Sequence, residues 1–91
     1  MEQMIFNEYL SQTRAERLRF SYNGNALPVG PRVRLEVRDR SGGLWIFVCK
    51  NEGDNMFSIS GSGWRDFAAG RIGYIVTLSK EGGEYKITAR N

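Results

Sequence analysis

The stretch that decides the fold runs from Arg32 to Lys50 and reads RVRLEVRDRSGGLWIFVCK. In its first part, Val33, Leu35 and Val37 alternate with charged residues. This is the period of a strand with one face buried and the other in solvent, and it predicts a strand over residues 32–39. The next four residues, 40–43, are polar or glycine and favour a hairpin turn.

The second half of this hairpin, residues 44–50, differs because both of its faces are apolar. Trp45, Phe47 and Cys49 share one face, and the residues between them (Leu44, Ile46, Val48) are apolar as well. A short apolar run of this kind is typical of a buried strand. We therefore expect a central strand of a barrel or sandwich, covered on both faces.

Outward from this hairpin, apolar or alternating segments separated by turn signals predict five more strands and one or two short helices. A helical turn capped by Ser11 or Thr13 is expected within residues 11–17, and a short helix ended by Gly70 within residues 64–69. The expected strands are 4–10, 18–22, 32–39, 44–50, 56–60, 72–79 and 84–90, with turns at 23–25, 28–31, 51–55 and 80–83. Seven strands with this spacing indicate a mostly β barrel or sandwich.

Composition limits the possible functions. A chain of 91 residues is expected to form one domain, residues 1–91. It contains no histidine, no phosphate-binding loop motif and a single cysteine, Cys49, which we expect to fill the core. We therefore predict no enzyme activity, no metal and no cofactor. The longest apolar run has six residues, far below the roughly 20 of a membrane-spanning helix, so we expect a soluble protein with no membrane partner.

Positive charge is concentrated in one part of the chain. The net charge is +3, but residues 14–40 hold seven arginines against three acidic residues. The guanidinium group is a planar fork that fits phosphate groups and the guanine edge. This pattern favours nucleic-acid binding, although a solvated charged surface explains the charge alone equally well.

Three motifs resemble the B3 DNA-binding domain of plant transcription factors: a strand that ends in Asp39, the segment SGGLWIF (41–47), and GWRDF (63–67). Residues 5–18, 73–78 and 84–88 are similar to the first strand and arm and to the last two strands of that family. The similarity covers nearly the whole chain. It implies a seven-stranded open pseudobarrel with one or two short helices.

The same resemblance implies sequence-directed binding of double-stranded DNA in transcriptional regulation, in the nucleus. Family members grip the major groove with two arms, which correspond here to a first arm (residues 11–17) and a second arm (residues 50–55). The DNA-binding residues carried over are Ser11, Gln12, Thr13, Arg14 and Arg17 in the first arm, and Lys50, Asn51 and Asn55 in the second. Arginine and asparagine can pair with guanine and adenine, and hydroxyl groups can bind phosphates.

Several residues depart from the family pattern. Glu8, Glu52 and Asp54 place acidic groups in or beside the arms, and Arg14 replaces an acidic residue. An alternative is therefore a degenerate barrel that acts as a protein-interaction module, through self-association or a partner protein, with little DNA affinity. A third hypothesis is a small barrel that binds single strands or oligosaccharides, which would need exposed aromatic residues. We expect instead that Trp45, Phe47, Trp64 and Phe67 lie in the core.

Overall fold

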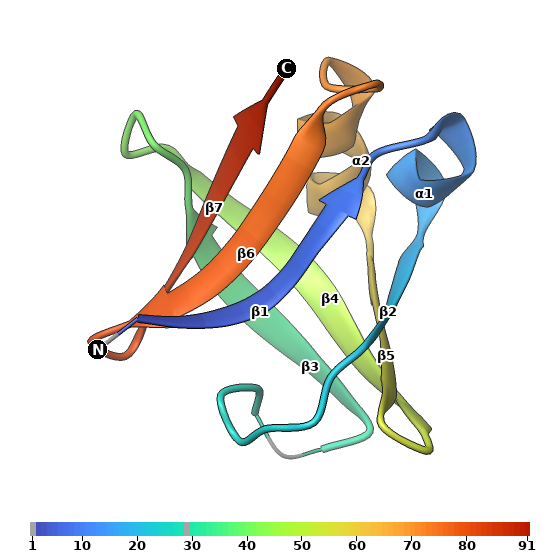
Figure 1. Ribbon diagram of the computed structural model, residues 1–91, viewed down its shortest axis with the longest axis vertical. Helices are drawn as coiled ribbons and strands as arrows, with labels where there is room; N and C mark the ends of the chain where they lie inside the picture. Colours follow the sequence, from blue (N-terminus) through green and yellow to red (C-terminus); the bar gives the residue numbers. More distant parts are fainter. Residues whose placement is uncertain (1, 29) are drawn as a thin grey trace.

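The computed structural model describes residues 2–28 and 30–91. These residues form seven β-strands, which make one curled sheet, and two α-helices (Figure 1). The strand order is β1-β6-β7-β3-β4-β5-β2. The elements are β1 (Glu2–Tyr9), α1 (Gln12–Glu16), β2 (Leu18–Ser21), β3 (Arg32–Arg38), β4 (Leu44–Gly53), β5 (Met56–Ser60), α2 (Ser62–Ala69), β6 (Ile75–Glu81) and β7 (Glu84–Arg90). The prediction of a seven-stranded open pseudobarrel with short helices is confirmed.

The sheet is nearly closed, and its open seam lies between the two end strands of this order, β1 and β2. Neighbouring strands are antiparallel except β3 and β7, which pair in parallel. Buried aromatic rings bridge the seam, because the ring centroids of Phe6 on β1 and Phe20 on β2 are 4.8 Å apart. Side-chain packing thus holds together the two strands that flank the opening.

A bulge in β1 lets two consecutive residues enter the core. The register with β6 shifts between Met4 and Phe6, so Ile5 has no direct partner. Without the bulge, Ile5 and Phe6 would point to opposite faces. With it, both side chains are buried.

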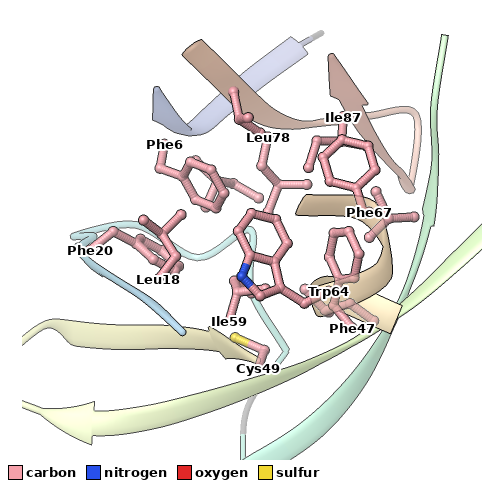
Figure 2. Close-up of a cluster of buried hydrophobic side chains, with 14 of the residues drawn as sticks. Phe6, Leu18, Phe20, Phe47, Cys49, Ile59, Trp64, Phe67, Leu78 and Ile87 are labelled. Carbon is pink, nitrogen blue, oxygen red and sulfur yellow. The ribbon is translucent and has the colours of Figure 1, made fainter. Parts of the chain in front are cut away.

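The centre of the barrel is aromatic (Figure 2). The Trp64 ring meets Phe47 edge to face, with centroids 5.2 Å apart, and stacks beside Phe67 at 5.9 Å. These three side chains are at most 1% exposed, while Trp45 is half-buried and packs edge to face against Phe67. The prediction that Phe47, Trp64, Phe67 and Cys49 belong to the core is confirmed, whereas Trp45, predicted with them, packs against the core and is only partly buried.

Trp64 also connects the two helices. Its indole Nε1–H donates a hydrogen bond to the backbone carbonyl of Arg14 on α1, at 2.9 Å. Helix α1 begins after Ser11, whose hydroxyl accepts a hydrogen bond from the Arg14 backbone N–H at 3.1 Å. Of the two residues predicted to cap this helix, Ser11 and Thr13, Ser11 is the N-cap.

The predicted burial of β4 on both faces is wrong for its outer face. Phe47 and Cys49 are buried, but Leu44 is half exposed and Ile46 and Val48 are only partly covered. The N-terminal end of α2 covers this face only locally, where Gly63 lies against the Ile46 carbonyl oxygen and a side chain would collide with it. Because the sheet curls around one core, its outer face lacks a second layer along most of β4.

Other element boundaries also differ from those predicted. Strand β4 continues to Gly53 and β6 to Glu81, so both hairpins turn through two residues instead of the longer loops expected at 51–55 and 80–83. Strand β6 begins at Ile75 instead of Ile72, because residues 71–74 form a turn closed by the Tyr74 N–H and the Arg71 carbonyl. Neither helix in the described part of the chain has the length and apolar character needed to span a membrane.

Asp39 organises the turn between β3 and β4. Its Oδ1 accepts hydrogen bonds from the Ser41 N–H (2.9 Å), the Ser41 hydroxyl (2.8 Å) and the Gly43 N–H (2.8 Å). Its Oδ2 accepts one from the Trp45 indole at 2.8 Å. These donors favour the charged carboxylate, and the Trp45 bond contributes most, so the pKa of Asp39 falls from 3.8 to about 2.

We expect Trp64→Phe to lower the free energy of unfolding by about 2–3 kcal/mol, since it removes the hydrogen bond to Arg14 and leaves a void beside Phe47. Urea unfolding followed by circular dichroism measures this change. Tyr9→Phe is the control, because Tyr9 is exposed and its substitution should change the value by less than about 0.5 kcal/mol. Equal effects of the two substitutions would contradict the role given to Trp64.

The lowered pKa of Asp39 predicts an acid-sensitive contribution to stability. Because the unfolded chain takes up a proton at this site at higher pH than the folded chain, the contribution is present above about pH 4 and is lost as the pH falls toward about 2. Unfolding measurements across this range should show a steeper loss for the unmodified chain than for Asp39→Asn. Parallel losses in the two proteins would rule out this contribution.

Candidate nucleic-acid interface

The first arm contains helix α1, and most of its predicted site residues are accessible. Gln12 and Thr13 are exposed on the helix, whereas Ser11 is half-buried and serves as the cap. The Arg14 guanidinium donates to the Tyr9 carbonyl at 2.9 Å and lies 3.2 Å from a Glu8 carboxylate oxygen. Arg14 is therefore held against the end of β1, with its side chain still 41% exposed.

The second arm is the tip of the β4–β5 hairpin. Asp54 and Asn55 are its two turn residues, with positive φ angles of 54° and 62°. Two consecutive residues with positive φ form the turn that matches the twist of a tight hairpin, and Asp and Asn tolerate this conformation well. The exposed Asn55 also accepts a hydrogen bond from the Tyr22 N–H through its backbone carbonyl. The turn conformation alone therefore explains why asparagine occurs at position 55, independently of any ligand that its side chain binds.

Lys50 and Asn51 point to opposite sides of β4, because adjacent strand residues alternate. Lys50 pairs in register with Arg32 and Ser58, while Asn51 pairs with Phe57, a residue packed against the core. Both side chains are exposed. The Asn51 amide oxygen also accepts a hydrogen bond from the Gly53 N–H at 2.9 Å, which leaves its amide N–H₂ group for other partners.

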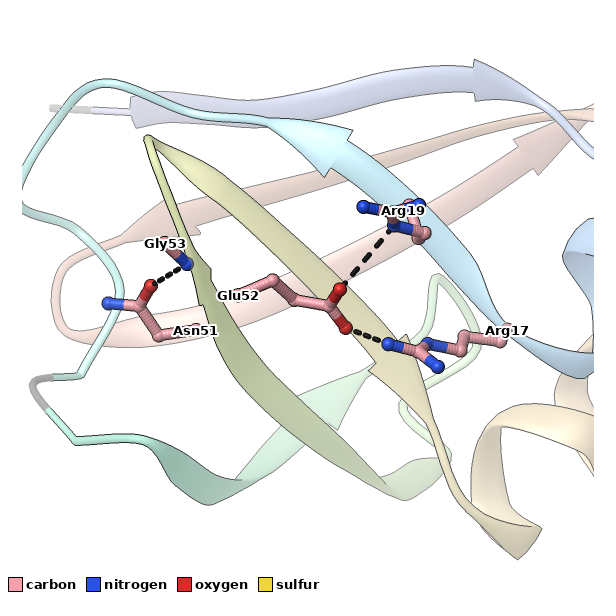
Figure 3. Close-up of polar contacts among 5 residues, drawn as sticks. All are labelled: Arg17, Arg19, Asn51, Glu52 and Gly53. Carbon is pink, nitrogen blue, oxygen red and sulfur yellow. Dashed lines mark hydrogen bonds and ion pairs between the residues drawn. The ribbon is translucent and has the colours of Figure 1, made fainter.

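Glu52 links the two arms (Figure 3). The register between β4 and β5 shifts between Asn51 and Gly53, so Glu52 is the extra residue of a bulge. Its carboxylate forms a hydrogen-bonded ion pair with Arg17 and a second ion pair, at 3.5 Å, with Arg19. Glu52 is only 14% exposed, whereas the two arginine side chains remain about half exposed. The acidic group that Glu52 places in the second arm is therefore paired with two arginines.

A row of basic residues crosses the outer face of the sheet and includes Lys50 of the second arm. The pairing Arg19↔Ser58↔Lys50↔Arg32 places these residues side by side on β2, β5, β4 and β3. Arg19, Lys50 and Arg32 are exposed, whereas Ser58 is buried and its hydroxyl has no hydrogen-bond partner among the described residues.

Sequence analysis did not select Arg19 or Ser58. The alternation of Leu18, Arg19 and Phe20, directly after the first arm, was the signal that could have identified Arg19. No sequence signal identified Ser58, since its place between two cations depends on strand pairing.

Within residues 2–28 and 30–91, no group of three or more Cys, Asp or Glu side chains is arranged to hold a metal ion. Cys49 is buried, and burial raises the pKa of its thiol to about 11. The thiol is thus protonated near neutral pH and is a poor nucleophile.

We expect Asn55→Gly to leave the free energy of unfolding within about 0.5 kcal/mol of the unmodified value, because glycine adopts positive φ readily. Asn55→Ala should lower it by about 1 kcal/mol, since alanine is strained in this conformation. Urea unfolding tests both variants. Asn55→Gly would then separate any binding role of the amide from its role in the turn. Equal stability of the two variants would contradict the strain argument.

Comparison with known proteins identifies the fold. No protein-family model and no curated protein matches the chain. Its structure is similar to that of the Arabidopsis FUS3–DNA complex, with a TM-score of 0.68 and 17% sequence identity over 98% of each chain. At this identity the similarity establishes the fold, and the resemblance to B3 domains seen in the sequence is confirmed at that level. The chain therefore has the B3-type pseudobarrel fold.

Proposed function

We propose that this chain binds double-stranded DNA in a sequence-directed manner and acts in transcriptional regulation in the nucleus, with its two arms gripping the major groove. The observation that carries the proposal is the row of exposed cations (Arg19, Lys50 and Arg32) that follows the first arm and includes Lys50 of the second, on the outer face of β2, β5, β4 and β3. The similarity to a protein solved in complex with DNA supports it.

The dimensions of this surface suit a DNA groove. Neighbouring strands lie about 4.8 Å apart, so the row from Arg19 to Arg32 spans about 14 Å across three strand spacings. The major groove is about 12 Å wide, so the row is long enough to contact phosphates along its rim. Such contacts supply affinity and orientation without sequence selection.

Base recognition requires polar groups that project beyond the phosphate contacts. Gln12 and Thr13 lie exposed on α1, and Asn55 lies at the tip of the second arm. Amide and hydroxyl groups can pair with base edges in the major groove. We assign base contacts to these residues and phosphate contacts to Arg14, Arg17 and Lys50. The remaining predicted contacts, Ser11 and Asn51, already use one side-chain oxygen each within the fold.

A protein-interaction module is the second candidate function. Two observations favour it: the first-arm arginines are paired with Glu8 and Glu52, and Met4 and Tyr9 are exposed on the end strand β1. An end strand offers free backbone groups for pairing with another chain. Binding to a partner protein that is unaffected by substitution of Arg14 would support this function.

The primary test is selection from a randomised duplex library at near-physiological salt, followed by sequencing. Enrichment of one short motif is expected if the arms read bases. Weak retention that shows no enrichment and disappears with added salt would contradict sequence-directed binding and favour the protein-interaction module.

Substitution of the first-arm arginines tests the assignment of phosphate contacts. Arg14→Gln/Arg17→Gln should weaken binding to duplex DNA and reduce the slope of log K against log salt by about 1.8, since each phosphate contact contributes about 0.9. Fluorescence anisotropy titrations at several salt concentrations measure this slope.

The matched control is Arg40→Gln/Arg90→Gln, which removes the same charge from the β3–β4 turn and from β7, both away from β2 (Figure 1). This control should change the slope little. Equal effects of the two double variants would remove the first arm from the interface and leave only a general attraction by net charge.

A further inference from the structure

We propose that Arg17, Arg19 and Ser58 form a phosphate site that the Glu52 carboxylate fills in the free protein, and that a backbone phosphate of duplex DNA displaces this carboxylate. The site itself is inferred from the contacts of these four residues. Its assignment to a DNA phosphate rests on the proposed function.

The unsatisfied hydroxyl of Ser58 is the first observation behind this proposal. Ser58 is 1% exposed, and its Oγ has no hydrogen-bond partner among the described residues. Burial of an unpaired hydroxyl costs free energy, and such groups are rare in folded proteins. Its neighbours in register are Arg19 on β2 and Lys50 on β4, two cations that would flank an anion bound above it.

The direction of the Glu52 side chain is the second observation behind this proposal. Glu52 belongs to β4, and its partners Arg17 and Arg19 lie beside and on β2, so its side chain reaches across β5, the strand that carries Ser58 (Figure 3). Each carboxylate oxygen contacts a different arginine: Oε2 contacts Arg17 and Oε1 contacts Arg19. The carboxylate thus lies where one anion bridges two guanidinium groups.

A phosphate satisfies this group of donors better than the carboxylate does. Its two free oxygens can bind both guanidinium groups, as the carboxylate oxygens do, and also accept a hydrogen bond from a hydroxyl. The arginine side chains are 48% and 59% exposed, so both are accessible from solvent while Glu52 lies largely covered between them. Exchange of Glu52 for a phosphate would give Ser58 the acceptor it lacks.

This exchange would make Glu52 a residue that limits the affinity for DNA. Every duplex must displace the carboxylate before it gains the phosphate contacts, so binding to any sequence is weakened. A duplex with favourable base contacts elsewhere compensates for this cost, whereas other sequences do not. Intramolecular competition of this kind lowers the affinity for all duplexes by the same factor. Only a duplex with favourable base contacts then binds tightly, while the ratio of specific to non-specific affinity is unchanged.

The test compares Glu52→Gln with Asp54→Asn, which removes the same charge two residues away. Asp54 is exposed, has no ion pair among residues 2–28 and 30–91, and lies in a turn conformation that asparagine adopts readily. In anisotropy titrations with a random-sequence duplex, Glu52→Gln should bind about three- to tenfold more tightly than the unmodified chain. Asp54→Asn should increase affinity by less than about twofold, because it removes only a solvent-screened repulsion at the tip of the second arm and releases no arginine.

Two further variants locate the effect at the proposed site. In an Arg17→Gln/Arg19→Gln background, Glu52→Gln should no longer increase affinity. Ser58→Ala, introduced with Glu52→Gln, should reduce affinity about three- to tenfold through loss of the hydroxyl contact. Its urea-unfolding midpoint should be unchanged or higher, because the hydroxyl has no partner in the free protein.

Titration with inorganic phosphate separates this inference from the proposed function. In the Glu52→Gln variant, phosphate should shift the NMR signals of the Arg17 and Arg19 Nε–H groups, whether or not the protein binds DNA. Duplex binding with equal effects of Glu52→Gln and Asp54→Asn would overturn the inference and leave the proposed function standing. Phosphate binding at these arginines without duplex binding in any variant would overturn the function and retain the site. Failure of both would overturn both.

Discussion

The hydrogen bond from the Trp64 indole to the Arg14 carbonyl is the contact on which the arrangement of the two helices depends. Trp64 lies at the centre of the aromatic core, between Phe47 and Phe67, and its one polar atom reaches the backbone of α1. The helix has five residues, which is too short to be stable alone, so its position must come from such a tertiary contact. The largest fully buried side chain of the described residues therefore also positions the first arm, so a substitution in the core would affect the interface.

The fold was predictable because its signals are local. Alternation over residues 32–38, turn residues at 40–43 and the helical spacing of Trp64 and Phe67 each needed only neighbouring residues, and the structure confirms them. The outer face of β4 was not predictable, because exposure of Leu44 depends on whether a distant element covers it. The lengths of the hairpins also escaped prediction. Polar residues such as Asn51 and Lys80 look like turn residues, yet they continue the strand pairing up to a two-residue turn.

The candidate interface was less accessible to sequence analysis than the core. The arm residues were placed by resemblance, and the structure shows most of them at the surface. The grouping of Arg17, Arg19, Glu52 and Ser58 depends on the register of three strands and on a bulge, which are properties of pairing. Glu52 illustrates the difference. In the sequence, Glu52 is an acidic residue in a basic region, whereas in the structure its carboxylate is the shared partner of two arginines.

The pairing of β1 with β6 affects how the chain can fold during synthesis. Glu2 lies opposite Glu81 and Tyr9 opposite Ile75, so this ladder joins residues that are 66 to 79 positions apart. Contacts between distant residues close large loops, and folds rich in such contacts form slowly, on the order of milliseconds to seconds. On the ribosome, β1 emerges before β6 and must wait for that strand before the two can pair. During that interval Ile5 and Phe6 stay outside a finished core, so the nascent β1 strand needs protection from aggregation until β6 has been synthesised.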